Sequence, residues 1–279
     1  MLNGLQNIGN TCYLNSALQF FFNIKQLVNI IINQDVTISK RTEKEIYDMV
    51  IFKKFILSYM QNTNNTLIPK DIKKIVSDLN SSFINYNQHD SSEFLIYLLE
   101  FVKLYINNNT IYDYLGININ INIKCKKLNC LHSNNSIQKE LFLFLNLSST
   151  LDNSYREFKK NEILENSYRC DKCKIKSISR KKTTIEKWPN DLIIILKRFD
   201  NNLRKLKDSI SIPIEWRHNY KLKGAIIHYG SNNFGHYIYY GKKNSNWYCF
   251  NDSCVSKINI NNVPLDQSYV LHYTKIISN

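Results

Sequence analysis

Cys12 is the residue whose type and position most directly suggest chemistry. It follows a loop that contains Gly9 and Asn10, and it stands at the start of an apolar run, Leu14 to Ile32, that predicts a helix. A thiol at a helix N-terminus lies among unpaired backbone N–H groups and near the positive end of the helix dipole, which favour the nucleophilic thiolate. A buried structural cysteine is the alternative, but small and polar residues ahead of it suit a loop that a substrate backbone approaches.

His236 is the best placed of the six histidines to act as a base. A cysteine nucleophile needs an imidazole that accepts its proton and returns it to a leaving amine. Six of the seven glycines lie in the two segments that would have to meet. They are Gly4 and Gly9 before Cys12, and Gly224, Gly230, Gly235 and Gly241 around His236. A histidine on the surface or in the core is the alternative, and it does not account for this clustering.

A third side chain should accept a hydrogen bond from the imidazole and fix its tautomer. Asn251 and Asp252 stand at the end of a predicted strand, Asn246 to Asn251, which is the natural hairpin neighbour of the His236 strand. Spacing alone does not choose between these two residues. A simple turn at residues 251–253 is the alternative interpretation.

Four of the seven cysteines form two closely spaced pairs. The pairs are Cys125 with Cys130 and Cys170 with Cys173. Two cysteine pairs on separate hairpin turns suit a tetrahedral structural zinc site, although the first pair has four intervening residues instead of the usual two. His132 is an alternative ligand. An odd number of cysteines does not suit a closed disulfide framework, and Cys249 and Cys254 are expected to pack on a strand and at its end.

The elements that must position these residues change in type along the chain. Up to about residue 107, apolar residues recur at helical spacing, and Thr42 with Glu45 and Asp90 with Glu93 have the spacing of a helix cap and its N3 partner. Helices are expected over 14–32 and 43–60, after Pro69, and over 95–106. The later part predicts strands at 117–123, 137–147, 192–196, 222–229, 236–241, 246–251 and 269–273. This arrangement predicts an α+β fold.

The composition is that of a folded globular protein. With 279 residues, 43% apolar and 13% aromatic, the chain can form a sizeable core. No apolar run approaches the roughly 18–20 residues of a membrane span, and no secretory signal pattern precedes the first motif, so we expect no membrane partner and a location in the cytoplasm or nucleus. The net charge of +14 is compatible with nucleic-acid binding. Because Lys, Ile and Asn are abundant together, codon bias also explains the charge, and nucleic acid is not expected as a partner.

Together these segments resemble the catalytic domain of ubiquitin-specific proteases over nearly the whole chain. The cysteine box matches at residues 4–15, and a second box matches from Gln88 to Phe94. The buried strand matches from Leu196 to Phe199, and the histidine box matches at residues 235–237 and again from Trp247 to Ser253. Because four motifs occur in the family's order, the chain is identified as a member of this family.

The resemblance implies a single papain-like domain and a mechanism. The domain would comprise a helical thumb at about residues 1–110, zinc-bearing β fingers at 111–187 and a β-rich palm at 188–279. Cys12 would attack the carbonyl of the terminal glycine of ubiquitin, with His236 as base and then acid and Asn251 as the residue that orients it. Asn7 matches the family's oxyanion-stabilising position, and Asp252 would assist through a bound water.

The resemblance also implies contacts with substrate. Asp90 and Glu93 match positions that bind the basic C-terminal tail of ubiquitin, which is compatible with their role at a helix start. Gln88, Gly235 and Tyr237 lie in the matching boxes and are expected to bind substrate. The expected partners are ubiquitin and ubiquitinated proteins, the chain is expected to be a monomer, zinc is structural, and catalysis needs no cofactor.

One residue departs from the commonest family pattern. Asn251 is neutral and cannot stabilise an imidazolium as an aspartate would, although some active members of the family have asparagine there. The alternative function is a catalytically inactive ubiquitin-binding module, and a basic zinc protein that binds nucleic acid is a third hypothesis.

Overall fold

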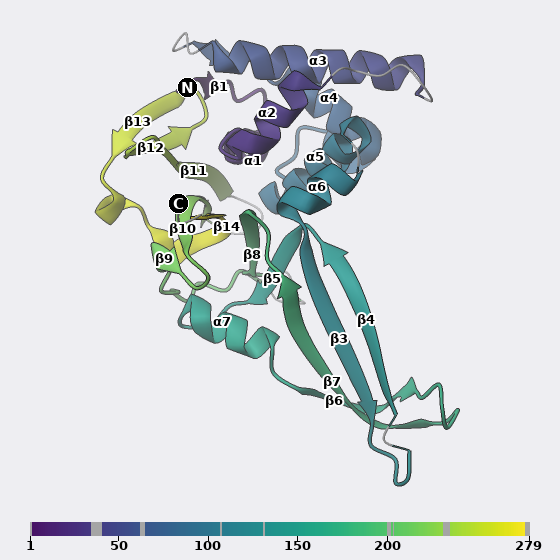
Figure 1. The fold of residues 1–279 in the computed structure, drawn as a ribbon. Helices are drawn as coiled ribbons and strands as arrows, with labels where there is room; N and C mark the ends of the chain where they lie inside the picture. The colour runs from purple at the N-terminus through teal and green to yellow at the C-terminus, as the bar shows by residue number, and fades with distance from the viewer. Residues whose placement is uncertain are drawn as a thin grey trace.

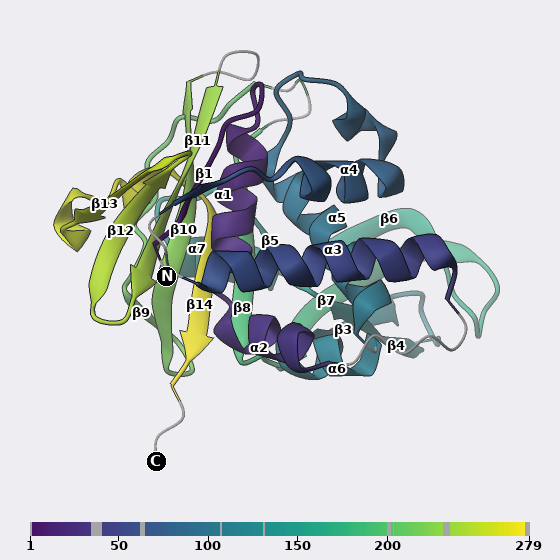
Figure 2. The ribbon, with the colours of Figure 1, turned by 90° about the horizontal axis from the view of Figure 1, so that it is seen from above.

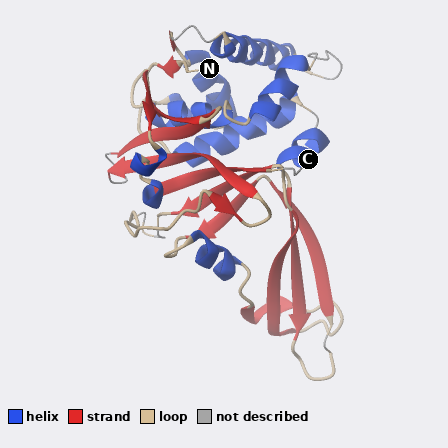
Figure 3. Cartoon of the chain, turned by 60° about the vertical axis from the view of Figure 1, so that its left-hand side comes forward, coloured by secondary structure: helices blue, strands red, loops and turns tan. Residues whose placement is uncertain are grey.

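The computed structural model arranges helices, a large sheet and a projecting smaller sheet along one chain (Figures 1 and 3). It describes residues 2–34, 41–61, 65–106, 108–130, 132–199, 202, 204–230 and 235–276. Two predicted features lie partly outside the described residues. One is the segment that carries His236, of which residues 231–234 are not described. The other is the predicted change from helices to strands at residue 107. Within the described ranges, no helix is long and apolar enough to cross a membrane.

The helical part comes first in the chain, as predicted. Its helices are α1 (Cys12–Phe21), α2 (Lys25–Asn33), α3 (Glu43–Met60), α4 (Lys70–Leu79), α5 (Ser91–Tyr105) and α6 (Asn108–Leu115), with the short 3-10 helix η1 (Ser81–Ile84). The predicted capping box is present, because Thr42 and Glu45 exchange hydrogen bonds at the start of α3. Two short strands, β1 (Gly4–Leu5) and β2 (Thr66–Leu67), pair in parallel.

The single helix predicted over residues 14–32 is wrong, because the chain turns between α1 and α2. Asn23 lies in this turn, is buried, and donates hydrogen bonds to the Lys223 carbonyl at 3.0 Å and to the Tyr239 hydroxyl at 2.6 Å. A buried amide is costly unless it is hydrogen-bonded, so these two acceptors favour the turn. All residues of α1 are buried, whereas α2 buries only one face. Asn23 is one of several polar residues in the run Leu14 to Ile32, so the sequence alone does not show which of them ends the first helix.

The large sheet follows the order β13-β12-β11-β10-β14-β8-β5, with β9 paired to β10. Its strands are β5 (Phe142–Asn146), β8 (Asp191–Lys197), β9 (Glu215–Trp216), β10 (Tyr220–Gly230), β11 (Gly235–Lys243), β12 (Asn246–Asn251), β13 (Cys254–Ile258) and β14 (Ser268–Lys275). The pairs are antiparallel except β5 with β8. Strand β13 was not predicted, since its alternation is short and mostly polar.

Strand β8 shows how the sheet divides the core. Its side chains alternate between two buried clusters: Ile193 and Ile195 face the helices, and Ile194 and Leu196 face the opposite side. A strand covered on both faces has a continuous apolar sequence, so the predicted buried strand at 192–196 is confirmed. Helix α1 packs between α5 and β11, in the middle of the first cluster (Figure 2).

A smaller sheet, called the finger sheet below, extends away from the rest of the molecule (Figure 1). It has the order β4-β3-β7-β6, with β3 (Ile117–Cys125), β4 (Ser133–Glu140), β6 (Glu162–Arg169) and β7 (Lys176–Lys187). The one strand predicted at 137–147 is wrong, because the chain crosses from β4 in the finger sheet to β5 in the large sheet at Leu141. The predicted finger segment 111–187 therefore contributes to both sheets, and it also contains helix α7 (Leu151–Phe158), which was not predicted.

Candidate active site

Cys12 is the first residue of α1 and is 3% exposed. The loop ahead of it is tied together by the Asn7 side chain, whose Oδ1 accepts hydrogen bonds from the backbone N–H groups of Gly9 at 3.1 Å and Thr11 at 3.0 Å. Gly9 has a positive φ of 112°, and a Cβ there would lie 2.9 Å from a ring carbon of Tyr86. Gly9 and the Asn7 side chain thus fix the conformation of the loop that places the Cys12 thiol at the start of α1, as predicted.

His236 stands at the start of β11 and faces Cys12. Its Nε2 is 2.6 Å from Oδ1 of Asn251, so Nδ1 is the nitrogen left for the Cys12 sulfur. A hydrogen bond with the Cys12 side chain is the main cause that raises the pKa of His236 to about 9. The bond to Asn251 and the negative charges of Cys12 and Asp252 also raise this pKa, while burial lowers it.

Asn251 and Asp252, which spacing could not separate, have different partners. Asn251 ends β12 and contacts His236, whereas Asp252 lies in the turn to β13 with a positive φ of 51°. The Asp252 carboxylate accepts hydrogen bonds from Nδ2 of Asn7 at 2.9 Å and from Nδ2 of Asn15 at 2.7 Å. Its backbone carbonyl accepts from Leu5 N–H at 2.9 Å. The structure therefore brings Asp252 to the cysteine loop and Asn251 to the imidazole.

Asn15 is a site residue that the sequence reasoning did not identify. It is 2% exposed and lies one turn after Cys12 in α1. Besides Asp252, its Nδ2 contacts the carbonyl oxygens of Leu5 at 3.2 Å and Gln6 at 3.3 Å. A polar residue three positions after the nucleophile was the available signal, because residues i and i+3 share a helix face.

Gln88 and Gly235 are bonded to each other across the two halves of the site. The Gln88 side chain donates to the Gly235 carbonyl at 2.9 Å and accepts from the Gly235 N–H at 2.9 Å. A Cβ on Gly235 would lie 1.9 Å from Nε2 of His228, so only glycine fits there. The Tyr237 side chain is buried and stacks on the His228 ring at a centroid distance of 4.4 Å. These contacts fix the strand segment that carries His236.

Asp90 and Glu93 lie together at the start of α5. Asp90 is the N-cap, and its Oδ1 accepts from the backbone N–H groups of Ser92 at 2.7 Å and Glu93 at 3.0 Å. Its Oδ2 accepts from the Tyr269 hydroxyl. Glu93 is exposed, and partial burial together with the negative charge of Asp90 raises its pKa. The predicted helix cap is confirmed, and the exposed Glu93 carboxylate faces solvent beside it.

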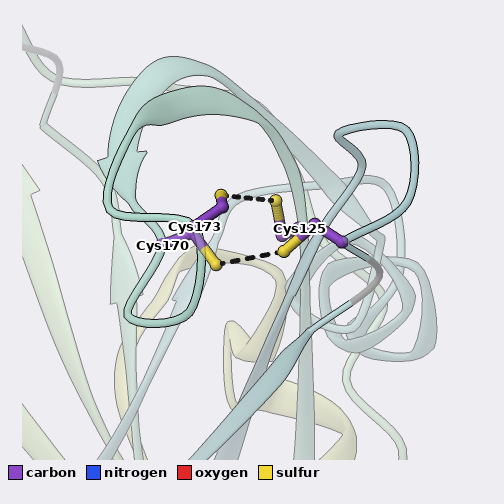
Figure 4. Close-up of side chains that lie close together, drawn as sticks. Cys125, Cys170 and Cys173 are labelled. Carbon is purple, nitrogen blue, oxygen red and sulfur yellow. Dashed lines mark hydrogen bonds between the residues drawn. The ribbon is translucent and has the colours of Figure 1, made fainter.

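The four predicted metal-ligating cysteines converge at the far end of the finger sheet (Figure 4). Their sulfur atoms all lie within 4.8 Å of one another, with Cys125 to Cys173 at 4.0 Å and Cys130 to Cys170 at 3.6 Å. Tetrahedral zinc with Zn–S bonds of about 2.3 Å places its sulfur atoms about 3.8 Å apart, so the cluster could hold zinc.

The wider spacing of the first cysteine pair does not prevent this convergence. Asn129 has a positive φ of 65° and lets the longer turn curl back so that Cys130 reaches the second pair. Among the described residues, the group of side chains that could hold a metal consists of these four cysteines and does not include His132. Outside this cluster, Cys249 is half-buried but Cys254 is exposed, so the expectation that Cys254 is a packing residue is wrong.

The helical part, the large sheet, the projecting finger sheet and a cysteine at a helix start facing a strand histidine define the papain-like class predicted from the sequence. Within that class, the family model described as "Ubiquitin carboxyl-terminal hydrolase" matches residues 3–273, and the chain therefore belongs to this family.

Curated relatives match nearly the whole chain. Ubiquitin carboxyl-terminal hydrolase 23 of Arabidopsis thaliana is 27% identical over 311 residues, which cover 98% of this chain and 35% of the relative. Ubiquitin carboxyl-terminal hydrolase 42 of Homo sapiens is 29% identical, with 98% of this chain and 23% of the relative covered. The chain thus spans about a quarter to a third of the length of these two relatives.

Solved structures show the same fold. The SAGA DUB module that contains Ubp8, bound to monoubiquitin, matches with a TM-score of 0.78 and 24% identity over 100% of this chain and 70% of that chain. The same module bound to ubiquitin aldehyde matches with a TM-score of 0.76 and 24% identity. The predicted α+β fold with a helical thumb, a β-rich palm and β fingers is confirmed.

Proposed function

We propose that this chain is a cysteine-type deubiquitinase that hydrolyses the isopeptide or peptide bond after the C-terminal glycine of ubiquitin. The observation that carries the proposal is the contact of the Cys12 thiol with an imidazole whose other nitrogen is 2.6 Å from the amide oxygen of Asn251. Family membership supports the type of reaction. The ubiquitin bound in both structural relatives supports the substrate.

The first half-reaction transfers the ubiquitin acyl group to Cys12. The raised pKa of His236 means that the imidazole keeps its proton at neutral pH, which favours a thiolate–imidazolium pair. The sulfur attacks the glycine carbonyl carbon, and the imidazolium gives its proton to the leaving amine. An S–C bond forms and the C–N bond breaks, which leaves a thioester and a free amine.

The second half-reaction returns the enzyme to its starting state. His236, now neutral, takes a proton from a water molecule whose oxygen attacks the thioester carbonyl. The S–C bond breaks, and the proton taken from water restores the thiolate–imidazolium pair. Ubiquitin leaves with a C-terminal carboxyl group, which releases the second proton of the water to solvent. Asn251 holds the ring by accepting from Nε2–H, so that Nδ1 stays directed at the sulfur in both steps.

We assign the oxyanion role to Asn7 and a positioning role to Asp252. The Nδ2 of Asn7 carries two hydrogens, and the hydrogen bond to Asp252 uses one of them. The second hydrogen is available for the negative oxygen of the tetrahedral intermediate. Asp252 therefore positions the Asn7 and Asn15 amides through direct hydrogen bonds. The family resemblance implies instead that Asp252 assists through a bound water.

We infer that Glu93 is the main acidic contact for the basic tail of ubiquitin. Both oxygens of Asp90 already accept hydrogen bonds from the start of α5 and from Tyr269. Asp90 therefore contributes to tail binding mainly through its negative charge and by capping α5. Glu93 is exposed, and from the described residues its side chain accepts a single 3.4 Å bond, donated by Asn80. Gln88 and Gly235 would border the same tail, because their mutual bond lies next to His236.

We propose that zinc is structural, held by the four cysteines and remote in sequence from the nucleophile. Zinc would join the two hairpin turns of the finger sheet, and catalysis uses only Cys12, His236 and the amides around them. All seven cysteines are free, which suits the reducing cytoplasm or nucleus.

A ubiquitin substrate with a fluorogenic group at its C-terminus tests the proposal. The protein should release the dye, Cys12→Ser should abolish release, and Cys254→Ser, which changes an exposed cysteine without a role in the proposed mechanism, should leave it unchanged. Dye release that survives Cys12→Ser would exclude this mechanism. Tight ubiquitin binding without any turnover by the unaltered protein would instead identify an inactive ubiquitin-binding module.

A further inference from the structure

A pocket at the junction of α1 and α2 is lined by lysines and belongs to neither the thiol site nor the zinc site. Its volume is about 210 Å³. The lining residues are Asn23, Lys25, Gln26, Tyr114, Asp191, Lys223, Lys242, Asn244 and Thr274. A water molecule occupies about 30 Å³ in the liquid, so this lysine pocket has room for a polyatomic ion and several waters.

Three lysines reach the pocket from three different elements. Lys25 starts α2, Lys223 lies on β10 and Lys242 lies on β11. Among the described residues, none of the three forms an ion pair, whereas the neighbouring Lys221 pairs with Glu215 at 2.9 Å. Burial and the positive charges of Lys242, Lys25 and Lys221 lower the pKa of Lys223. The three lysines therefore repel one another, and the negative charge of Asp191 opposes this effect only in part.

The one carboxylate in the pocket, Asp191, is already occupied. Its Oδ1 accepts from Nε2 of His272 at 2.6 Å and from the Thr274 hydroxyl, and its Oδ2 accepts from the Tyr114 hydroxyl at 2.6 Å. Asp191 is buried, and these donors hold it at the floor of the pocket. Its charge offsets one lysine and leaves a net positive pocket.

The start of α2 adds further donors. The residue before the helix, Ile24, has no side chain that can accept a hydrogen bond, and no side chain caps the helix. The first backbone N–H groups of a helix have no partner within it, and they favour an anion together with the helix dipole. Lys25 and Gln26 line the pocket, so the first turn of α2 borders it.

A further lysine follows Lys242 in the chain and is buried. Lys243 is 7% exposed, and its Nζ is 3.5 Å from the Phe22 carbonyl and 5.8 Å from the centroid of the Phe250 ring. Burial and the positive charge of Lys25 lower the pKa of Lys243 to about 7. An anion in the pocket would reduce the positive potential that this buried amine experiences.

We propose that the lysine pocket binds a small soluble anion that carries phosphate groups. Phosphate combines multiple negative charge with several acceptor oxygens, which matches three ammonium groups that form no ion pair with a described residue and the N–H groups at a helix start. Carboxylates offer fewer acceptor oxygens for the same three lysines. The site lies at the opposite end of α1 from Cys12, so its occupancy is separate from the hydrolytic chemistry.

Thermal unfolding and calorimetry with inorganic pyrophosphate test this site directly. Ionic strength is held constant with sodium chloride, since screening alone changes charge repulsion. Pyrophosphate should raise the Tm of the unaltered protein in a saturable way. The double variant Lys223→Gln with Lys242→Gln should weaken pyrophosphate binding by at least about tenfold, because each charge-assisted hydrogen bond is worth about that factor.

A matched variant separates the pocket from overall charge. Lys139→Gln with Lys257→Gln removes the same charge from exposed positions on β4 and β13, and it should bind pyrophosphate as the unaltered protein does. Equal loss in both double variants, or absence of saturable binding to the unaltered protein, would overturn the proposal. Citrate binding as tightly as pyrophosphate would overturn the assignment to phosphate.

The folding of the pocket variant is checked without ligand. Removal of two mutually repelling charges should leave its Tm equal to or above that of the unaltered protein. If the double variant does not fold, the single variants decide the question: each should lose part of the affinity, and unchanged affinity in both would reject the site.

Discussion

The thiol site and the finger sheet are held together in different ways. At the thiol site, side chains far apart in the sequence bond to one another: Asp252 joins Asn7 and Asn15, and Gln88 joins Gly235. In the finger sheet, strand β4 is exposed along its whole length, and the outer end depends on four cysteines from two hairpin turns. The site therefore depends on the complete fold, whereas the outer fingers depend on a local cluster.

This difference follows from where apolar surface is available. Helix α1 is buried over its entire length and carries the nucleophile into the main core. Ile117 and Ile119 are buried only at the base of β3, and the strand becomes partly exposed beyond them. A sheet without a core needs another source of stability, and a metal that joins its turns would supply it.

The largest expected effect is the loss of the imidazole. His236→Ala should lower kcat/KM for a fluorogenic ubiquitin substrate by about 10²–10⁴-fold, because it removes the acid and base of both half-reactions. The variant should still fold, which circular dichroism measures, since the side chain is half-buried. His218→Ala, at a turn outside the site, is the control and should retain activity. Activity within a few-fold of the unaltered protein would remove His236 from the mechanism.

The next effect tests the hydrogen bonds that join the two sides of the site. Asn7→Ala should lower kcat by about 10²-fold or more with little change in KM, because an oxyanion donor acts mainly in the transition state. Asp252→Ala should lower kcat through the same amide, so the double variant should be little worse than Asn7→Ala alone.

Two other results would contradict this assignment. Additive losses in the double variant would show that Asp252 acts independently of Asn7. A rise in KM with unchanged kcat for Asn7→Ala would place Asn7 in substrate binding instead of in transition-state stabilisation.

The third prediction concerns the finger sheet. Metal analysis of the purified protein should find about one zinc per chain. A strong chelator should raise hydrogen exchange in β3, β4, β6 and β7 before it affects the Cys12 loop or β10 to β12, because the metal joins only the finger turns. Cys170→Ser should reproduce the effect of the chelator, and Cys254→Ser should not. Protein without zinc, or simultaneous loss of protection in both regions, would contradict the local role.

The two regions also differ in how far the sequence predicts them. The buried strand at 192–196, the cap at Asp90 and the four cysteines are local patterns, and the structure contains all of them. The roles of Asn251 and Asp252 depend on where β12 ends and turns, which a string of three polar residues does not specify.

The incorrect or missed sequence predictions also depend on contacts between segments that are distant in the chain. The break after Phe21 depends on acceptors provided by Lys223 and Tyr239, some two hundred positions later in the chain. The crossing between two sheets at Leu141 depends on pairing of β5 with β8. Asn15 was missed because its partner, Asp252, comes from the other end of the chain. Contacts between distant segments decide these features, and local periodicity does not contain them.

The smallest expected effect is on the pH dependence of the thiol site. The pKa of His236 is raised to about 9, so the folded protein binds this proton more tightly than the unfolded chain, whose histidine titrates near about 6.5. This contribution to stability is fully present below about pH 6.5 and is lost as the pH rises through about 9. The acid that protonates the leaving amine is lost over the same range, so kcat/KM should fall above about pH 9.

Asn251→Ala sharpens this test, because it removes one of the causes that raise the pKa of His236. The alkaline fall in kcat/KM should move to lower pH in this variant, while the remaining contact with Cys12 keeps it above the range of an ordinary histidine. NMR titration of the His236 ring measures the same proton without turnover, and Cys12→Ser should lower that pKa further because the thiol contact is the larger cause. An alkaline limit that stays in place in Asn251→Ala would show that the asparagine orients the ring without stabilising its charged form.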